Sequence, residues 1–134
     1  MECLEYRVGG LEIDLERIGP SRLGEEHKFV VEAIDNIASI YVTQTLGHQL
    51  VGEIFRLAKP RIIGGGSLYL LDDKLFLNNY SKDYGSISKV AAQKFAELII
   101  PELEKQGVKP IGIVANPNED YINNYWRNID SNSK

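Results

Sequence analysis

The sequence predicts an α+β fold: a single domain in which a mixed β-sheet has two main helices packed on it. The length of 134 residues suits one domain. Short stretches that are β-branched, or that alternate between apolar and polar residues, predict strands. Two longer stretches with apolar residues every three or four positions predict helices. The predicted order, β-β-β-β-α-β-β-β-α-β, gives a mixed sheet with helices packed on it.

Residues 1–26 are predicted to form an N-terminal hairpin extension. The segment LEYRVGGLEIDLERI indicates two short strands about a turn at Gly9-Gly10. The β-branched segment HKFVVEAI then predicts a strand that begins at His27. Asp35-Asn36 is predicted to be a turn, and residues 37–45 are predicted to be the partner strand.

Helical spacing of apolar residues next predicts a helix that starts near His48 and is ended by Pro60. The following segment, RIIGGGSLYLLDDKLFL, indicates a strand, a break at residues 64–66, and a hairpin that turns at Asp72-Asp73. Glycines inside a strand pattern indicate either a bend of the sheet or a close approach of a neighbouring side chain or ligand. The bend is the simpler interpretation.

The last third of the chain contains the clearest helix, which is predicted to begin near Ser86 and to be capped by Gly107. Residues 109–115 predict a short strand in the sheet interior, because they are largely apolar. Residues 117–134, rich in asparagine and charge, are predicted to form a peripheral C-terminal arm, although Tyr121, Tyr125 and Trp126 could dock on the body of the domain. The predicted apolar stripe of the helix consists of Ile87, Val90, Ala91, Phe95, Leu98, Ile99 and Leu103.

Composition excludes several classes of function. The net charge of −4 argues against a general nucleic-acid binder, which is usually basic. A single cysteine excludes an internal disulfide framework and a cysteine-based metal cluster, and it indicates a reducing, cytoplasmic setting. No apolar run approaches the ~20 residues of a membrane span, and the N-terminus lacks the pattern of a signal peptide. We therefore expect no membrane partner, no metal and no cofactor.

Of the two histidines, His48 is the candidate for chemistry. It follows Gly47 at a predicted strand-to-helix junction, where amides are unpaired and an imidazole could accept a proton from water. Alternatively, His48 is a helix-start residue whose ring is satisfied by a carbonyl, and spacing alone favours neither reading. His27 is expected to be an exposed strand end.

The loop YSKDYGS lies at a second predicted helix start. Its amides and the hydroxyl of Ser81 could hold an anion. The loop by itself favours a simpler role, in which it caps the following helix through Ser86 or Ser88.

The order of these features resembles the small phosphohistidine phosphatases, the Janus/Ocnus family. The shared order is a strand with an early lysine (HKFVVE), a second strand leading to a histidine at a helix start, IGGGSLYL, NYSKDYGS before a long helix, and a strand ending in VAN. The resemblance covers about residues 27–116 and implies a phosphohistidine-phosphatase-like fold. It further implies metal-independent hydrolysis of the P–N bond of phosphohistidine, in a phosphorylated protein or a small phosphoramidate.

Carried over residue by residue, the resemblance makes His48 the general base for the attacking water. Phosphate would be held at the histidine corner, by the YSxxYG loop and by a lysine on the first matching strand. Gly47 and Asp83 differ from the family pattern. They motivate the alternative of a non-catalytic phosphate-binding module, and a scaffold that forms oligomers through the C-terminal arm is a third reading. The implied phosphate-binding residues are Lys28, Gly47, His48, Gln49, Ser81, Asp83 and Gly85.

Overall fold

Six strands form one sheet in the computed structural model, in the spatial order β1-β3-β2-β4-β5-β6. The structure describes residues 4–14, 27–44, 48–78, 81, 83–116, 120, 122 and 125–126. The strands are β1 (Glu5–Leu11), β2 (His27–Ile34), β3 (Ile37–Gln44), β4 (Ile62–Leu71), β5 (Lys74–Asn78) and β6 (Gly112–Asn116).

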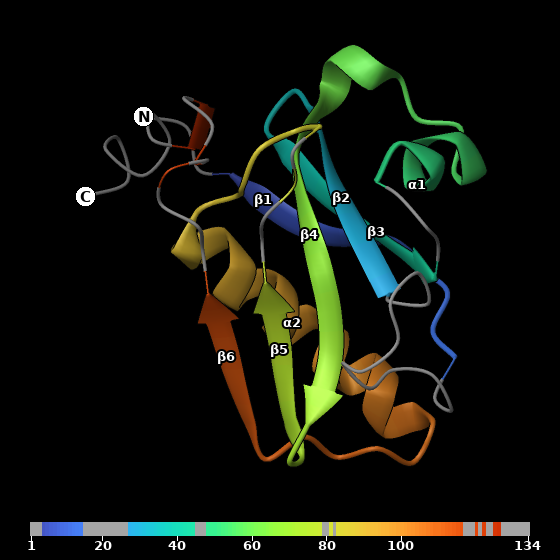
Figure 1. Cartoon of the computed structure of the whole chain (residues 1–134), viewed down its shortest axis with the longest axis vertical. Coiled ribbons are helices and arrows are strands. Elements are labelled where there is room, and N and C mark those ends of the chain that lie inside the picture. Colours follow the sequence, from blue (N-terminus) through green and yellow to red (C-terminus); the bar gives the residue numbers. More distant parts are fainter. Residues whose placement is uncertain are drawn as a thin grey trace.

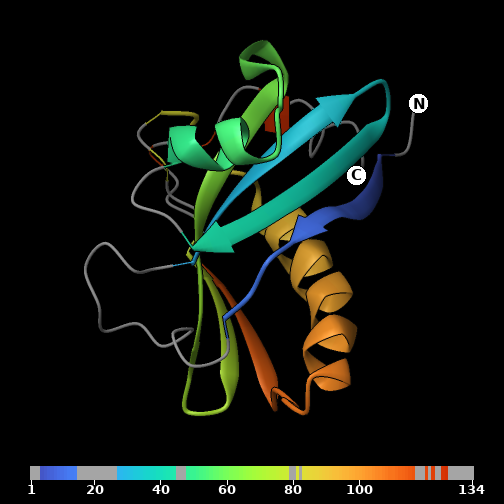
Figure 2. The same cartoon turned by 90° about the vertical axis from the view of Figure 1, so that its right-hand side faces the viewer.

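The sheet is mixed, as predicted. β1 pairs with β3, and β6 with β5, in parallel, whereas the central pairs β2–β3, β2–β4 and β4–β5 are antiparallel. The sheet is strongly curled, so that β2 and β3 cross the direction of β5 and β6 (Figure 2). The α+β class and the two packed helices are therefore confirmed.

The two helices cover opposite faces of this sheet (Figures 1 and 2). α1 (His48–Ile54) packs mainly on β2, and α2 (Lys89–Lys105) packs against β6, β1 and β5. A short 3₁₀ turn, η1 (Lys59–Arg61), precedes β4. In the part of the chain that the structure describes, neither helix has the length and apolarity needed to cross a membrane.

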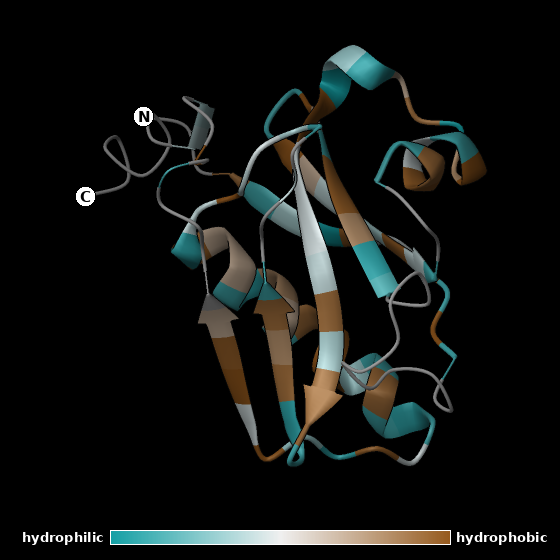
Figure 3. Ribbon diagram, in the orientation of Figure 1, coloured by the Kyte–Doolittle hydropathy of each residue, from teal (hydrophilic) through white to brown (hydrophobic). Residues whose placement is uncertain are grey.

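Most of the buried apolar side chains belong to the α2 face. Phe29 and Val31 of β2 pack there against Phe95 of α2, while Val30, between them in sequence, faces α1 instead. Figure 3 shows β5 and β6 largely brown, whereas pale and brown bands alternate along β4. The alternation along β2 reflects the two-residue period of a strand that is covered on both faces.

The predicted hairpin at Gly9-Gly10 is wrong. β1 runs through both glycines as one edge strand, with a bulge between Val8 and Gly10. A Cβ atom at Gly9 would collide with the ring of Tyr41, and one at Gly10 would lie 2.5 Å from Cε1 of Phe55. The glycines are therefore needed for the close approach of two rings, and a turn does not explain them.

Helix α1 is shorter than predicted, because it ends at Ile54 before reaching Pro60. Arg56 adopts a left-handed φ of 57°, and the N–H of Leu57 donates to the carbonyl of Gly52 over 2.8 Å. This is the hydrogen-bond pattern of a left-handed C-terminal cap. Pro60 lies in η1 instead.

The predicted break at residues 64–66 is also wrong, because β4 continues unbroken through the three glycines. The hairpin at Asp72-Asp73 is confirmed, and both residues have positive φ, as a two-residue type I′ turn requires. Residues 112–116 form an edge strand rather than an interior one. Their apolar character reflects packing of one face against α2.

Helix α2 begins at Lys89, where the Oγ of Ser88 accepts the N–H of Ala91. Gly107, with φ of 90°, terminates it as predicted. Two members of the predicted stripe, Val90 and Leu98, are instead exposed.

The C-terminal arm is not peripheral in its described part. Trp126 is completely buried in the α2-face core, and its Nε1 donates to the carbonyl of Ile63 over 3.0 Å. Ile122 forms an isolated parallel bridge with Ser86. The aromatic side chain at 126 thus belongs to this chain's own core, which leaves it unavailable as an exposed anchor for a second subunit.

Candidate functional site

The two site segments predicted from sequence meet over a glycine of β4. A Cβ atom at Gly65 would lie 3.1 Å from Cδ2 of His48 and 3.3 Å from Cβ of Ser81. On its third side it would lie only 2.8 Å from the carbonyl oxygen of Phe29. Gly65 therefore leaves the room in which the start of α1 and the loop before α2 come together. The close-approach reading of the glycines is the one the structure bears out.

His48 is half-buried at the first position of α1, and its ring is held by β4. Its Nε2 lies 2.8 Å from the carbonyl oxygen of Gly66. A carbonyl only accepts hydrogen bonds, so Nε2 carries the hydrogen, and in the neutral ring Nδ1 carries the lone pair. The carbonyl contact, one of two readings of the sequence, therefore fixes the tautomer of the ring.

The loop before α2 is locked to β4 by its own hydrogen bonds. Ser81 is buried, and its Oγ accepts the N–H of Tyr84 over 3.3 Å. The N–H of Gly85 donates to the Ser81 carbonyl over 2.8 Å, and the Gly85 carbonyl accepts the N–H of Gly65 over 3.0 Å. Ser81 can still donate its hydroxyl hydrogen to an anion. The amide of Gly85, a residue predicted to bind phosphate, is used within the loop.

A side-chain hydrogen bond joins the two halves of the site at its edge. Nε2 of Gln49 donates to Oδ1 of Asp83 over 3.2 Å, and both side chains are exposed. The Asp83 carboxylate is therefore directed toward α1. Its negative charge lies beside the proposed anion site and opposes anion binding there.

Lys28 lies on the same face of the sheet as His48. It is the second residue of β2, is only 8% exposed, and pairs with Ser67 of β4. Paired residues of antiparallel strands, and residues two apart along a strand, share a face. Val30 pairs with Gly65, so Lys28 belongs to the face on which His48 and Ser81 approach Gly65. The arrangement brings an imidazole, a hydroxyl group and a buried lysine to one face of the sheet.

Comparison of the chain with protein-family models, with curated proteins and with solved structures gave no match. The assignment of the site therefore rests on its geometry. Gly47, predicted to contribute to the phosphate site, lies outside the described residues. Within the described segments, His, Cys, Asp and Glu side chains form no group of three or more that could hold a metal ion.

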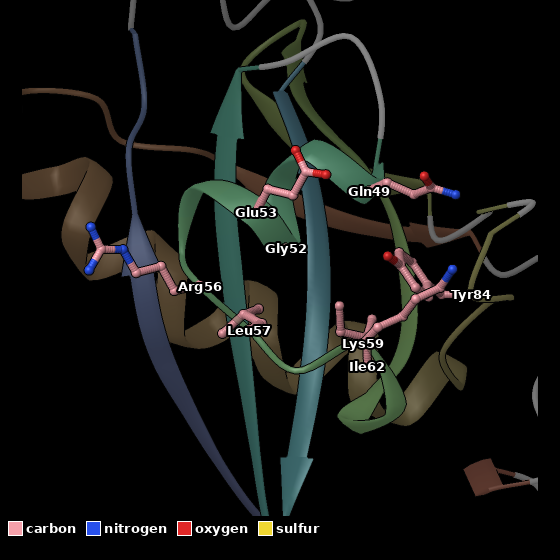
Figure 4. Close-up of a pocket in the computed structure, with 8 residues that line it drawn as sticks. All are labelled: Gln49, Gly52, Glu53, Arg56, Leu57, Lys59, Ile62 and Tyr84. Carbon is pink, nitrogen blue, oxygen red and sulfur yellow. The ribbon is translucent and has the colours of Figure 1, made fainter.

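Sequence reasoning missed a pocket that adjoins this site. It has a volume of about 260 Å³ and lies between α1, η1 and the loop before α2 (Figure 4). The only signal in the sequence was a glycine inside a predicted helix, Gly52, which costs a helix about 1 kcal/mol relative to alanine. Buried or half-buried lining residues are Gly52, Leu57, Ile62 and Tyr84, and exposed ones are Gln49, Glu53, Arg56 and Lys59.

His27 is not the exposed strand end that the sequence suggested. It is 1% exposed, and its Nε2 accepts the N–H of Asp14 over 2.9 Å. Its Nδ1 is buried and has no hydrogen-bond partner among the residues that the structure describes. Burial lowers the pKa of His27, and the nearby Asp14 charge partly raises it again. His27 therefore joins the segment after β1 to the sheet, and His48 remains the histidine with a candidate chemical role.

Proposed function

We propose that this protein is a metal-independent phosphoramidate phosphatase of the phosphohistidine-phosphatase type, acting in the cytoplasm on phosphohistidine. The observation that carries the proposal is the approach of His48 and Ser81 over Gly65, with the His48 ring held by the Gly66 carbonyl. Lys28 adds positive charge on the same face. The order of sequence features shared with the Janus/Ocnus family supports the same reaction.

In this proposal the imidazole of His48 takes a proton from water as the water oxygen bonds to phosphorus. The P–N bond breaks, and the leaving nitrogen receives a proton from Lys28 or from a second water. The products are inorganic phosphate and histidine. Phosphoryl transfer depends mainly on positioning and charge stabilisation. The Ser81 hydroxyl, the Lys28 ammonium and the N–H groups of His48 and Gln49 would supply them.

The test is release of inorganic phosphate from a phosphohistidine peptide in the presence of EDTA. We expect His48→Ala to lower turnover about 10²–10⁴-fold, as loss of a general base does. Gln93→Ala, an exposed change on α2, is the control and should leave turnover unaltered. Full activity of His48→Ala would show that the base is misplaced.

A second function is favoured by the Asp83 carboxylate at the edge of the site. In that reading the protein binds a phosphorylated partner without hydrolysing it. This second function predicts that the protein binds a phosphopeptide and that inorganic phosphate displaces the peptide. It also predicts that the folded wild-type protein releases no phosphate from it.

A further inference from the structure

The pocket beside the site, here called the α1 pocket, shares residues with the two segments that form the site. Gln49, on its exposed side, donates to Asp83 of the loop before α2. Tyr84, on its inner side, donates its N–H to the Oγ of Ser81. The pocket therefore opens directly beside the place proposed for the phosphoryl group, and it is separate from that place.

The inner part of the α1 pocket is apolar. Leu57 and Ile62 line it together with the ring of Tyr84, and Gly52 contributes no side chain. Burial, together with the charges of Asp83 and Glu53, raises the pKa of Tyr84, so its phenol is neutral at physiological pH. The uncharged inner surface suits an apolar group.

The exposed edge of the pocket carries charges of both signs. Glu53 and Lys59 offset each other, and the Arg56 side chain points away from the other labelled residues in Figure 4. The edge thus has no strong preference for an anion or a cation. The volume of the α1 pocket, about 260 Å³, is below the roughly 300–1,000 Å³ of pockets that enclose drug-sized ligands. It is sufficient for one amino-acid side chain.

We propose that the α1 pocket binds a bulky apolar side chain next to the phosphorylated residue of a polypeptide substrate. This inference rests on the proposed function and adds how a polypeptide substrate is recognised: through an apolar neighbour of the phosphorylated residue. A small phosphoramidate bound between His48 and Ser81 would leave the pocket unfilled. A side chain that belongs to the same polypeptide as the phosphorylated residue can fill the α1 pocket while the phosphoryl group lies between His48 and Ser81. Its binding energy then contributes to the reaction.

The experiment compares kcat/KM for matched phosphohistidine peptides that differ only beside the phosphohistidine. Leucine, glycine or aspartate is placed at the preceding or the following position, and a small phosphoramidate is assayed in parallel. We expect the wild-type protein to prefer leucine over glycine about tenfold at one of the two positions, as filling an apolar pocket provides. Gly52→Leu, which places a side chain in the pocket, should bring this ratio close to one.

The leucine-to-glycine ratio of kcat/KM is informative even if Gly52→Leu lowers activity overall. If that variant does not fold, the wild-type ratio by itself still tests the proposal. Equal turnover of the leucine and glycine peptides, with the small phosphoramidate also hydrolysed, would overturn the pocket assignment and leave the proposed function intact. A preference for aspartate would likewise overturn the apolar assignment and point to Lys59. Absence of turnover on every substrate by folded protein would remove the proposed function and this inference together.

Discussion

The two faces of the sheet are built differently. On the α2 face, large buried side chains such as Phe29, Phe95 and Trp126 form one continuous core. On the α1 face, the buried apolar residues of the described chain are Val30, Val51 and Ile62, and polar Lys28 is buried beside them. The comparison indicates that one face supplies most of the stability, while the other gives space to polar groups at the site.

Helix α1 is also the weaker element by its own properties. It has seven residues, includes Gly52 and ends at Ile54, just before the left-handed Arg56, whereas α2 has seventeen residues and caps at both ends. Helices as short as α1 depend on packing for their stability. Local opening of α1 should therefore require less free energy than opening of α2.

The largest expected effect tests the α2 face directly. Phe95→Ala should lower the free energy of unfolding by about 3–5 kcal/mol, because it empties a fully buried ring site. Val51→Ala on the α1 face should cost only about 1–2 kcal/mol for its two lost methyl groups. Urea unfolding of both variants provides the measurement. Equal costs would break the proposed division between the two faces.

Two glycine-to-alanine substitutions, one at the site and one elsewhere in the sheet, test the role of the close approach at Gly65. Gly65→Ala should cost about 1–3 kcal/mol of stability through overpacking, and it should lower phosphate release, because its Cβ would press on Phe29, His48 and Ser81. Gly112→Ala is the matched control, since its Cβ would meet only Cγ of Lys74 at an ordinary 3.7 Å. Thermal melts and the phosphate assay should separate the two variants. If both behave alike, the close approach at Gly65 has no functional meaning.

His27 should make the stability of the protein depend on pH. Burial lowers the pKa of His27 in the folded protein below its ordinary value of 6.5. The unfolded chain therefore binds a proton more readily, and stability present above about pH 6.5 is lost as the pH falls toward the folded-state pKa. Unfolding measured between pH 8 and pH 5 should show this loss, and His27→Gln should flatten it. An unaltered profile in His27→Gln would assign the pH dependence to other groups.

The smallest expected effect concerns the charge at the edge of the site. Asp83→Asn keeps an oxygen acceptor for Gln49 and removes the negative charge. Because the pair is exposed, the gain in affinity for inorganic phosphate should be only about two- to fivefold, and salt should reduce it. Titration calorimetry at low and high ionic strength measures it. Weaker phosphate binding by Asp83→Asn would mean that the carboxylate helps to organise the site.

Local signals in the sequence were sufficient for several elements. The turn at Asp72-Asp73, the cap at Gly107 and the strand from His27 depend on residues close together in the chain, and each was predictable. The candidate site was partly predictable in the same way, because His48 and Ser81 each lie at a junction between elements. Their order along the chain suggested that they belong together.

The tertiary structure alone decided where distant residues meet. At Gly9 the ring of Tyr41 lies against a bulged edge strand instead of the predicted hairpin, and packing buries His27 and Trp126. The α1 pocket and the meeting of His48 with Ser81 at Gly65 depend on the pairing of β4 with β2. Periodicity and turn residues act over a few positions, so the sequence by itself determined both helices, most of the strands and the local turns and caps. Strand order and the contacts of facing side chains arise only when segments far apart in the chain pack together.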